Sequence, residues 1–86
     1  MRRGEYDIIG DILNIANDKS RTQIMYGANL SFRQLDKYIS LLLEKKLLKI
    51  SKHGNPRIKY ELTDDGRKYL KAFQGIKVLL KEFPFI

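Results

Sequence analysis

The 86-residue chain contains no cysteine and a single histidine. Disulfide bonds are therefore excluded, and a structural zinc site, which is built mostly from Cys and His ligands, is not expected. No apolar run approaches the roughly 20 residues that a membrane-spanning helix requires, and the first residues lead into no signal-type apolar segment. The sequence thus predicts a soluble cytoplasmic protein, for which oligomerisation is the remaining means of reinforcing a thin core.

Acidic residues are also scarce: 17 Lys and Arg stand against 10 Asp and Glu, so the formal net charge is +7. Apolar residues make up 43% of the chain, which suffices for one small domain without linkers or repeats. Residues 31–60 hold eight basic and two acidic side chains and therefore carry +6 of the +7. Positive charge gathered in one segment favours a polyanion-binding surface over charge that serves only solubility.

Apolar residues recur every three or four positions in three segments, as they do in amphipathic helices. We expect helices over residues 5–18, over residues 22–28, and from Ser31 to about Lys45, where Ser31 and Gln34 have the spacing of a capping box. The expected core face of the third helix consists of Phe32, Leu35, Ile39, Leu42 and Leu43. Tyr38 and Leu41 fall at the boundary of that face and are left unassigned.

Two alternating segments follow, residues 47–52 and 58–62, and the turn formers Gly54, Asn55 and Pro56 lie between them. This pattern predicts a β-hairpin. Thr63 then supplies a helix N-cap, followed by two acids in the first turn, and a fourth helix is expected to end near residue 82. The predicted fold class is therefore mainly α with a small β-hairpin (α+β), in the order three helices, strand, turn, strand, helix.

The fourth helix carries a stripe of apolar residues at alternating spacings of four and three, which is the pattern of a heptad seam. The stripe consists of Tyr69, Phe73, Ile76, Leu80 and Phe83. It serves either to pack against the first helix or to join two chains. Because Leu62 and Leu70 suffice for the core, we expect the stripe to extend beyond it and to form a homodimer.

The order of elements, with a tight connection between the second and third helices and a basic hairpin tip, resembles the winged helix-turn-helix. The resemblance rests on residues 22–25, 28–31, 42–48 and 60–66, together with Leu35. Residues 24–35, Ile-Met-Tyr-Gly-Ala-Asn-Leu-Ser-Phe-Arg-Gln-Leu, are similar to the helix-turn-helix of the small archaeal winged-helix DNA-binding proteins. That family dimerises through a C-terminal helix, usually longer than this one, which forms an antiparallel coiled coil. The resemblance implies a DNA-binding domain at residues 1–63 and a dimerising helix at residues 64–86.

A winged helix places its third helix in the major groove and its hairpin on the DNA backbone. The expected recognition residues are Ser31, Arg33, Gln34, Lys37 and Ser40. Of these, Arg33 matches guanine O6 and N7, and Gln34 matches adenine N6 and N7. The expected backbone contacts are Arg21, Lys52, His53, Asn55, Arg57 and Lys59. A solvated helix face and a solubilising loop are the plain alternatives, and Arg2 and Arg3 are expected to belong to a solvated chain end.

The resulting hypothesis is sequence-specific binding of double-stranded DNA by a dimeric archaeal transcriptional regulator located on the nucleoid. A chromatin-type architectural protein with weak sequence preference, a protein-docking module and an RNA-binding protein remain alternatives. No enzyme is expected, because Asp64 and Asp65 are adjacent helix-capping acids and no nucleophile has a histidine partner. No cofactor or metal is expected either, since His53 has no second ligand of its kind.

Overall fold

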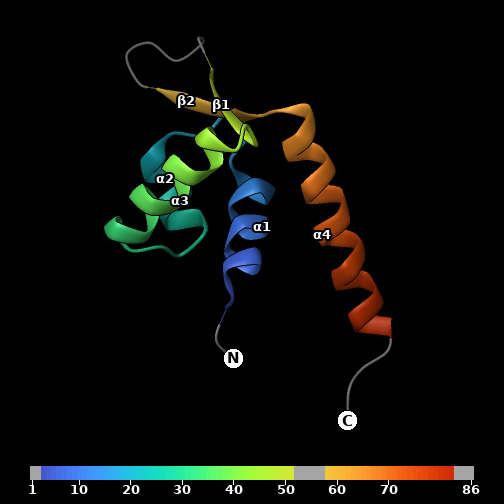
Figure 1. Ribbon diagram of the computed structural model, residues 1–86. Helices are drawn as coiled ribbons and strands as arrows, with labels where there is room; N and C mark the ends of the chain where they lie inside the picture. The colour runs from blue at the N-terminus through green and yellow to red at the C-terminus, as the bar shows by residue number, and fades with distance from the viewer. Residues whose placement is uncertain (1–2, 52–57, 83–86) are drawn as a thin grey trace.

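The computed structural model describes residues 3–51 and 58–82, with side chains up to residue 80 in the last helix. The elements are α1 (Glu5–Ile15), α2 (Arg21–Gly27), α3 (Phe32–Glu44), β1 (Leu48–Ser51), β2 (Lys59–Leu62) and α4 (Asp64–Glu82). Figure 1 shows the three short helices gathered below the hairpin, while α4 leaves the hairpin and descends on the other side of α1. The predicted fold class is confirmed.

Side-chain caps fix where the helices begin. Ser31 Oγ accepts from the Gln34 N–H at 3.2 Å, and Gln34 Oε1 accepts from the Ser31 N–H at 3.0 Å, as the sequence predicts. Ser20 and Gln23 form a second, unpredicted capping box, so α2 begins one residue earlier than expected. The first helix ends at residue 15, not 18, because Asp18 has a φ of 62° and its N–H donates to the Tyr60 carbonyl at 2.7 Å.

The core lies where α1, α2 and α3 meet the base of the hairpin. Its largest fully buried side chains are Ile12, Leu13, Ile24, Leu35, Ile39, Leu42 and Leu48. The prediction that Phe32 belongs to this core is wrong, since 72% of the residue is exposed, whereas Tyr38 is 5% exposed. Tyr38 continues the stripe of Leu35, Ile39 and Leu42, while Phe32 lies in the first turn of α3, beyond the residues that would cover it.

The hairpin is antiparallel and pairs Leu48 with Leu62 and Ile50 with Tyr60. Its second strand also joins the connection between α1 and α2, because the Tyr60 N–H donates to the Lys19 carbonyl at 2.9 Å. The simple alternation expected for the first strand is wrong, since Ile50 is exposed and Ser51 is buried. Of the paired residues Ile50 and Tyr60, only Tyr60 is buried, and it also bridges to Lys19 in the connection between α1 and α2.

The helix α4 begins at the Thr63 cap, whose Oγ1 accepts from the Gly66 N–H at 3.0 Å. Its first half packs on α1: Phe73 lies against Gly10, and the Tyr69 hydroxyl donates to the Tyr6 carbonyl at 2.9 Å. Within the described chain, we find no helix with both the length and the apolar character needed to cross a membrane.

Candidate nucleic-acid interface

The outer face of α3 is the first part of the candidate site. Burial of Leu35, Ile39 and Leu42 turns the opposite side of the helix to solvent, and Arg33, Lys37, Ser40 and Glu44 are exposed there. In the described ranges 3–51 and 58–82, the Arg33 guanidinium has no ion-pair or hydrogen-bond partner. The predicted helix therefore presents a free guanidinium in its first turn.

The angle between α2 and α3 is fixed by a tight turn. Asn29 has a φ of 55°, a left-handed conformation that asparagine tolerates, and the Leu30 N–H donates to the Met25 carbonyl at 2.9 Å. Arg3 closes the turn by donating to the Ala28 carbonyl at 2.9 Å and to the Asn29 carbonyl at 3.1 Å. It also pairs with Asp11 at 3.1 Å. The expectation of a solvated end is therefore wrong for Arg3, while Arg2 lies outside the described residues.

Two of the expected recognition residues also form the cap of α3. Ser31 Oγ and Gln34 Oε1 each accept a backbone N–H, so the cap occupies one polar atom of each side chain. The Gln34 amide nitrogen keeps its two N–H groups for another partner. A bidentate contact from Gln34 to adenine uses both Oε1 and Nε2, and Oε1 has a second lone pair for it, so the cap restricts the orientation of the amide but leaves its atoms available.

Acidic side chains from other parts of the chain lie close to several of the expected cationic contacts. Lys37 Nζ is 3.8 Å from Glu5 Oε1, and Lys59 Nζ is 3.9 Å from Asp18 Oδ1. The count of +6 for residues 31–60 missed this compensation, because both acids precede the segment. Exposed pairs of this length contribute about 0–1 kcal/mol, so DNA phosphates exchange with them at little cost.

Arg21, at the start of α2, joins three elements. Its guanidinium forms an ion pair with Asp36 of α3 and contacts the Tyr60 side chain of β2. Hydrogen bonding to Tyr60, together with the Asp36 carboxylate, raises the pKa of Arg21 above its already high value. Arg21 is therefore fully charged and lies beside the outer face of α3.

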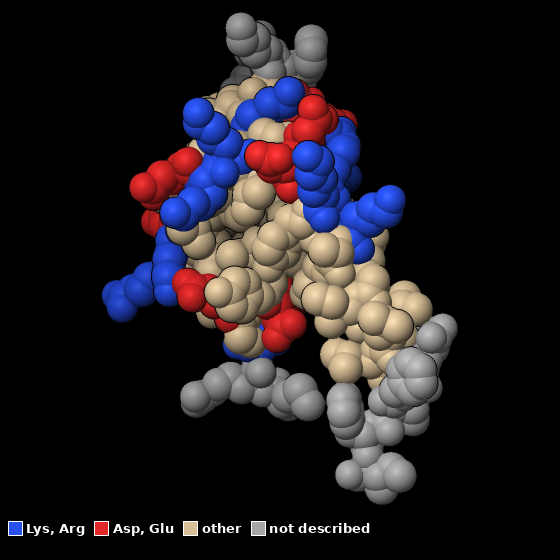
Figure 2. All heavy atoms as spheres, turned by 45° about the vertical axis from the view of Figure 1, so that its right-hand side comes forward, with Lys and Arg blue, Asp and Glu red and all other residues tan. Residues whose placement is uncertain are grey.

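Four of the expected backbone contacts, Lys52, His53, Asn55 and Arg57, lie outside the described residues. Figure 2 shows the Lys and Arg side chains gathered in the upper half of this view, with acidic side chains between them.

In the part of the chain that the structure describes, no three His, Cys, Asp or Glu residues are grouped so that they would hold a metal ion.

The second half of α4 is apolar and open. Of the expected dimer seam, Tyr69 and Phe73 pack on α1, whereas Ile76 and Leu80 are 57% and 49% exposed. Phe83 lies outside the described residues. Val78 and Leu79 are also exposed, and neither falls at a heptad position: Leu79 lies beside the seam, whereas Val78 lies on the opposite side of the helix.

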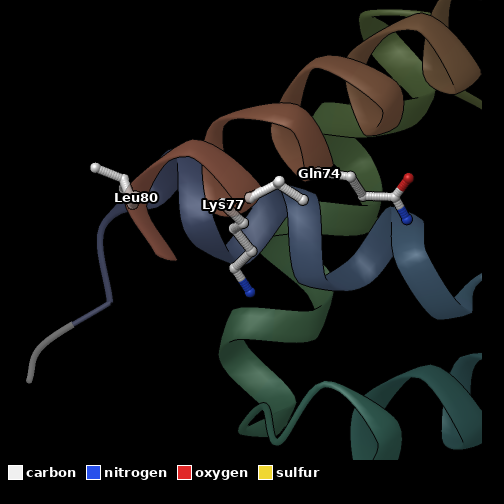
Figure 3. Close-up of a pocket in the computed structure, with 4 residues that line it drawn as sticks. Gln74, Lys77 and Leu80 are labelled. Carbon is white, nitrogen blue, oxygen red and sulfur yellow. The ribbon is translucent and has the colours of Figure 1, made fainter. Parts of the chain in front are cut away.

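A hollow of about 600 Å³ lies along this part of α4, lined by Gln74, Lys77, Val78 and Leu80. In Figure 3, Gln74 and Leu80 extend from α4 in different directions, and Lys77 lies between them along the helix. The Lys77 ammonium lies 4.9 Å from the centre of the Phe73 ring and 3.8 Å from Asp11 Oδ1. Apart from Lys77, this stretch therefore offers an almost uncharged surface, which belongs to the tan area to the right of centre in Figure 2.

Three helices with a tight turn between the last two, followed by a β-hairpin, define the winged-helix class of proteins. The family model described as winged helix-turn-helix matches residues 2–81. The chain therefore belongs to the winged helix-turn-helix family.

Individual relatives agree with this assignment. The uncharacterised protein MJ0287 of Methanocaldococcus jannaschii is 31% identical over 85 residues, covering 96% of this chain and 82% of that protein. The crystal structure of Sso10a-2, a DNA-binding protein from Sulfolobus solfataricus, matches with a TM-score of 0.78 and 27% identity, covering 94% of this chain and 85% of that one. MepR, a transcription regulator of a Staphylococcus aureus multidrug efflux pump, matches with a TM-score of 0.78 and 18% identity, covering 90% and 61% of the two chains, and shows the fold alone.

Proposed function

We propose that the protein binds double-stranded DNA sequence-specifically as a transcriptional regulator, with α3 in the major groove and the hairpin on the backbone. The observation that carries this proposal is the free Arg33 guanidinium on the outer face of a helix whose N-terminus is capped and whose angle to α2 is fixed. A helix-turn-helix inserts the exposed N-terminal half of its second helix, here α3, into the major groove.

The proposal gives each group a separate task. Arg33 donates to guanine O6 and N7, Lys37 and Ser40 contact neighbouring bases or phosphates, and Ser31 and Gln34 hold the helix start. Gln34 adds its amide N–H groups and the second lone pair of Oε1, in the orientation that the cap sets. Arg21 and Lys59, with the hairpin residues Lys52, His53, Asn55 and Arg57, contact the backbone and so set the position of α3 on the duplex.

The relatives support DNA binding by an archaeal protein. Sso10a-2, which is 27% identical, is a DNA-binding protein. MJ0287 and Sso10a-2 both come from archaea, which supports a role as an archaeal regulator located in the cytoplasm on the nucleoid.

The same proposal includes a homodimer formed through the second half of α4. In the described seam, Ile76 and Leu80 are the residues that α1 does not cover, and Leu79, beside the seam, widens the apolar surface. A two-fold contact places the same side chains on both partners, so an apolar helix end is self-complementary. Residues 1–63 then present α3 and the hairpin, while residues 64–86 join the two chains and, through Tyr69 and Phe73, brace α1.

The DNA part is tested with Arg33→Ala and Lys37→Ala against Lys71→Ala, which removes the same charge from an exposed position on α4. Fluorescence anisotropy with a duplex enriched by selection from a random pool, at about 0.05 M and 0.15 M salt, measures the dissociation constants. We expect the two α3 variants to bind at least about tenfold more weakly and Lys71→Ala to bind like the wild type, since a base-contacting pair contributes about 1–3 kcal/mol. Equal binding by all four proteins would contradict the assignment of α3.

The dimer part is tested with the double variant Ile76→Ser and Leu80→Ser in analytical ultracentrifugation. We expect the wild type to sediment as a dimer and this variant as a monomer, because the two serines remove the apolar surface that joins the chains. Ile58→Ser is the control, since it removes an equally exposed isoleucine from the hairpin side. A monomeric wild type, or a variant that remains dimeric, would contradict the assignment of this surface.

A further inference from the structure

An acid lies on the DNA-facing side of α3 and holds a cation that the proposed function requires. Asp36 lies in the second turn of α3, and its carboxylate pairs with the guanidinium of Arg21 from the start of α2. Both side chains reach solvent, with 66% of Asp36 and 40% of Arg21 exposed. The pair therefore lies at the surface between the two helices of the helix-turn-helix, beside the outer face that carries Arg33.

The fold alone does not account for Asp36. Aspartate is a poor helix former in a helix interior, and α3 has no acid in its first turn, where the helix dipole would favour one. An exposed ion pair adds little to stability. A carboxylate beside a phosphate-facing surface also weakens DNA binding by repulsion. An aspartate at position 36 therefore makes both helix formation and DNA binding less favourable. We infer that it has a role that compensates for these losses.

We propose that Asp36 acts as an internal substitute for a DNA phosphate: it occupies Arg21 in the free protein and in non-specific complexes, and so raises the ratio of specific to non-specific binding. This inference rests on the proposed DNA-binding function. It makes Asp36 a specificity-determining residue that contacts no base.

Non-specific and specific complexes with DNA depend on different contacts. Binding to an unselected duplex derives from phosphate neutralisation, so one occupied cation lowers its affinity directly. At a selected site, base contacts from Arg33 fix the register and hold the start of α2 against the backbone. A phosphate then replaces the Asp36 carboxylate at Arg21, and the affinity lost to Asp36 is smaller there.

The test compares Asp36→Asn with Asp65→Asn, which raises the net charge equally but removes an acid that pairs with Lys68 on α4 at 4.0 Å. Anisotropy titrations use a random duplex and the duplex enriched by selection, each over a range of salt concentrations. We expect Asp36→Asn to bind the random duplex roughly three- to tenfold more tightly, with a salt slope steeper by about 0.9. The gain for the enriched duplex is expected to be smaller, and Asp65→Asn is expected to change either affinity by less than about twofold.

A double variant tests whether Asp36 acts through Arg21. In Arg21→Gln with Asp36→Asn, the gain for random duplex is expected to disappear, because the released cation is itself removed. Thermal melts followed by circular dichroism verify that each variant is folded.

The outcomes separate this inference from the function on which it rests. If the wild type binds no duplex at low salt, the proposed function and this inference are both wrong. If the wild type binds but Asp36→Asn behaves like Asp65→Asn, only the role of Asp36 is wrong. If Asp36→Asn instead binds the enriched duplex more weakly and prefers a different base at one position, Asp36 reads a base directly, which also contradicts the inference.

Discussion

Two glycines of α4 provide a matched pair of substitutions with opposite expected effects on stability. At Gly75 an added Cβ meets no atom within 4 Å. At Gly66 it lies 2.1 Å from the Leu47 carbonyl oxygen, a backbone atom that also accepts the Thr63 N–H at 3.2 Å. The same methyl group is therefore free at one position and blocked at the other.

The magnitudes follow from these surroundings. Gly75→Ala removes the backbone entropy cost of a helical glycine and is expected to stabilise the protein by about 0.5–1 kcal/mol. For a domain of this size that corresponds to a rise in Tm of about 2–8 °C. Gly66→Ala forces the start of α4 away from Leu47, in the connection between α3 and β1, by roughly 1 Å or more, and overpacking of this kind costs about 1–3 kcal/mol.

The assay is thermal unfolding followed by circular dichroism, with all proteins at one concentration so that any association is constant. We expect Gly75→Ala to melt above the wild type and Gly66→Ala to melt at least about 4 °C below it. A Gly66→Ala variant as stable as the wild type would refute the close packing of α4 on Leu47. A destabilised Gly75→Ala variant would refute the open surroundings of that position.

Three further substitutions test the packing of α1 on α4 and the contact of Arg3 with the turn between α2 and α3. Gly10→Ala brings a methyl to 2.5 Å from the Phe73 ring and is expected to lower the Tm, whereas an unchanged Tm would show that Phe73 does not rest there. Burial, followed by the neighbouring Tyr6 and Asp7, raises the pKa of Tyr69 above its usual 10.0. The stability gained from its neutral hydroxyl is then complete below pH 10 and lost as pH rises through the raised pKa, so the advantage of wild type over Tyr69→Phe in urea unfolding is expected to shrink above pH 10. Arg3→Ala leaves the Ala28 and Asn29 carbonyls, in the turn after α2, without this donor and is expected to cost about 1–3 kcal/mol in urea unfolding, while a loss below about 0.5 kcal/mol would contradict the role of Arg3 in holding the turn.

Local signals were sufficient to predict most of the fold. The capping box at Ser31, the turn formers of the hairpin and the Thr63 cap each act within a few residues, so the sequence alone locates α3, the strands and the start of α4. The same holds for the outer face of α3, because Arg33 and Lys37 lie opposite a clear apolar stripe.

The features that could not be predicted from the sequence depend on contacts between distant segments. Helical projection left Tyr38 unassigned and placed Phe32 in the core, because it does not show where neighbouring helices end. Charge counting by segment missed the pairing of Glu5 with Lys37, since these residues meet only after folding. Arg3 was unpredictable for the same reason: its acceptors are carbonyls of a turn 25 residues further along the chain.

The division of the α4 stripe also required the structure. A heptad pattern shows that one face of a helix is apolar but not what covers that face. Tyr69 and Phe73 contact α1, whereas Ile76 and Leu80 extend beyond it. The open half of the stripe is therefore the part available for a second chain.

The central claim is that the α3 face reads DNA sequence. Its most direct test is selection from a pool of random duplexes at about 0.15 M salt, followed by sequencing of the bound fraction, with Arg33→Ala treated in parallel. We expect the wild type to enrich a two-fold symmetric site that contains guanine in each half, and Arg33→Ala to lose the preference at that guanine. Binding without enrichment, or the same enriched site with Arg33→Ala, would contradict the claim.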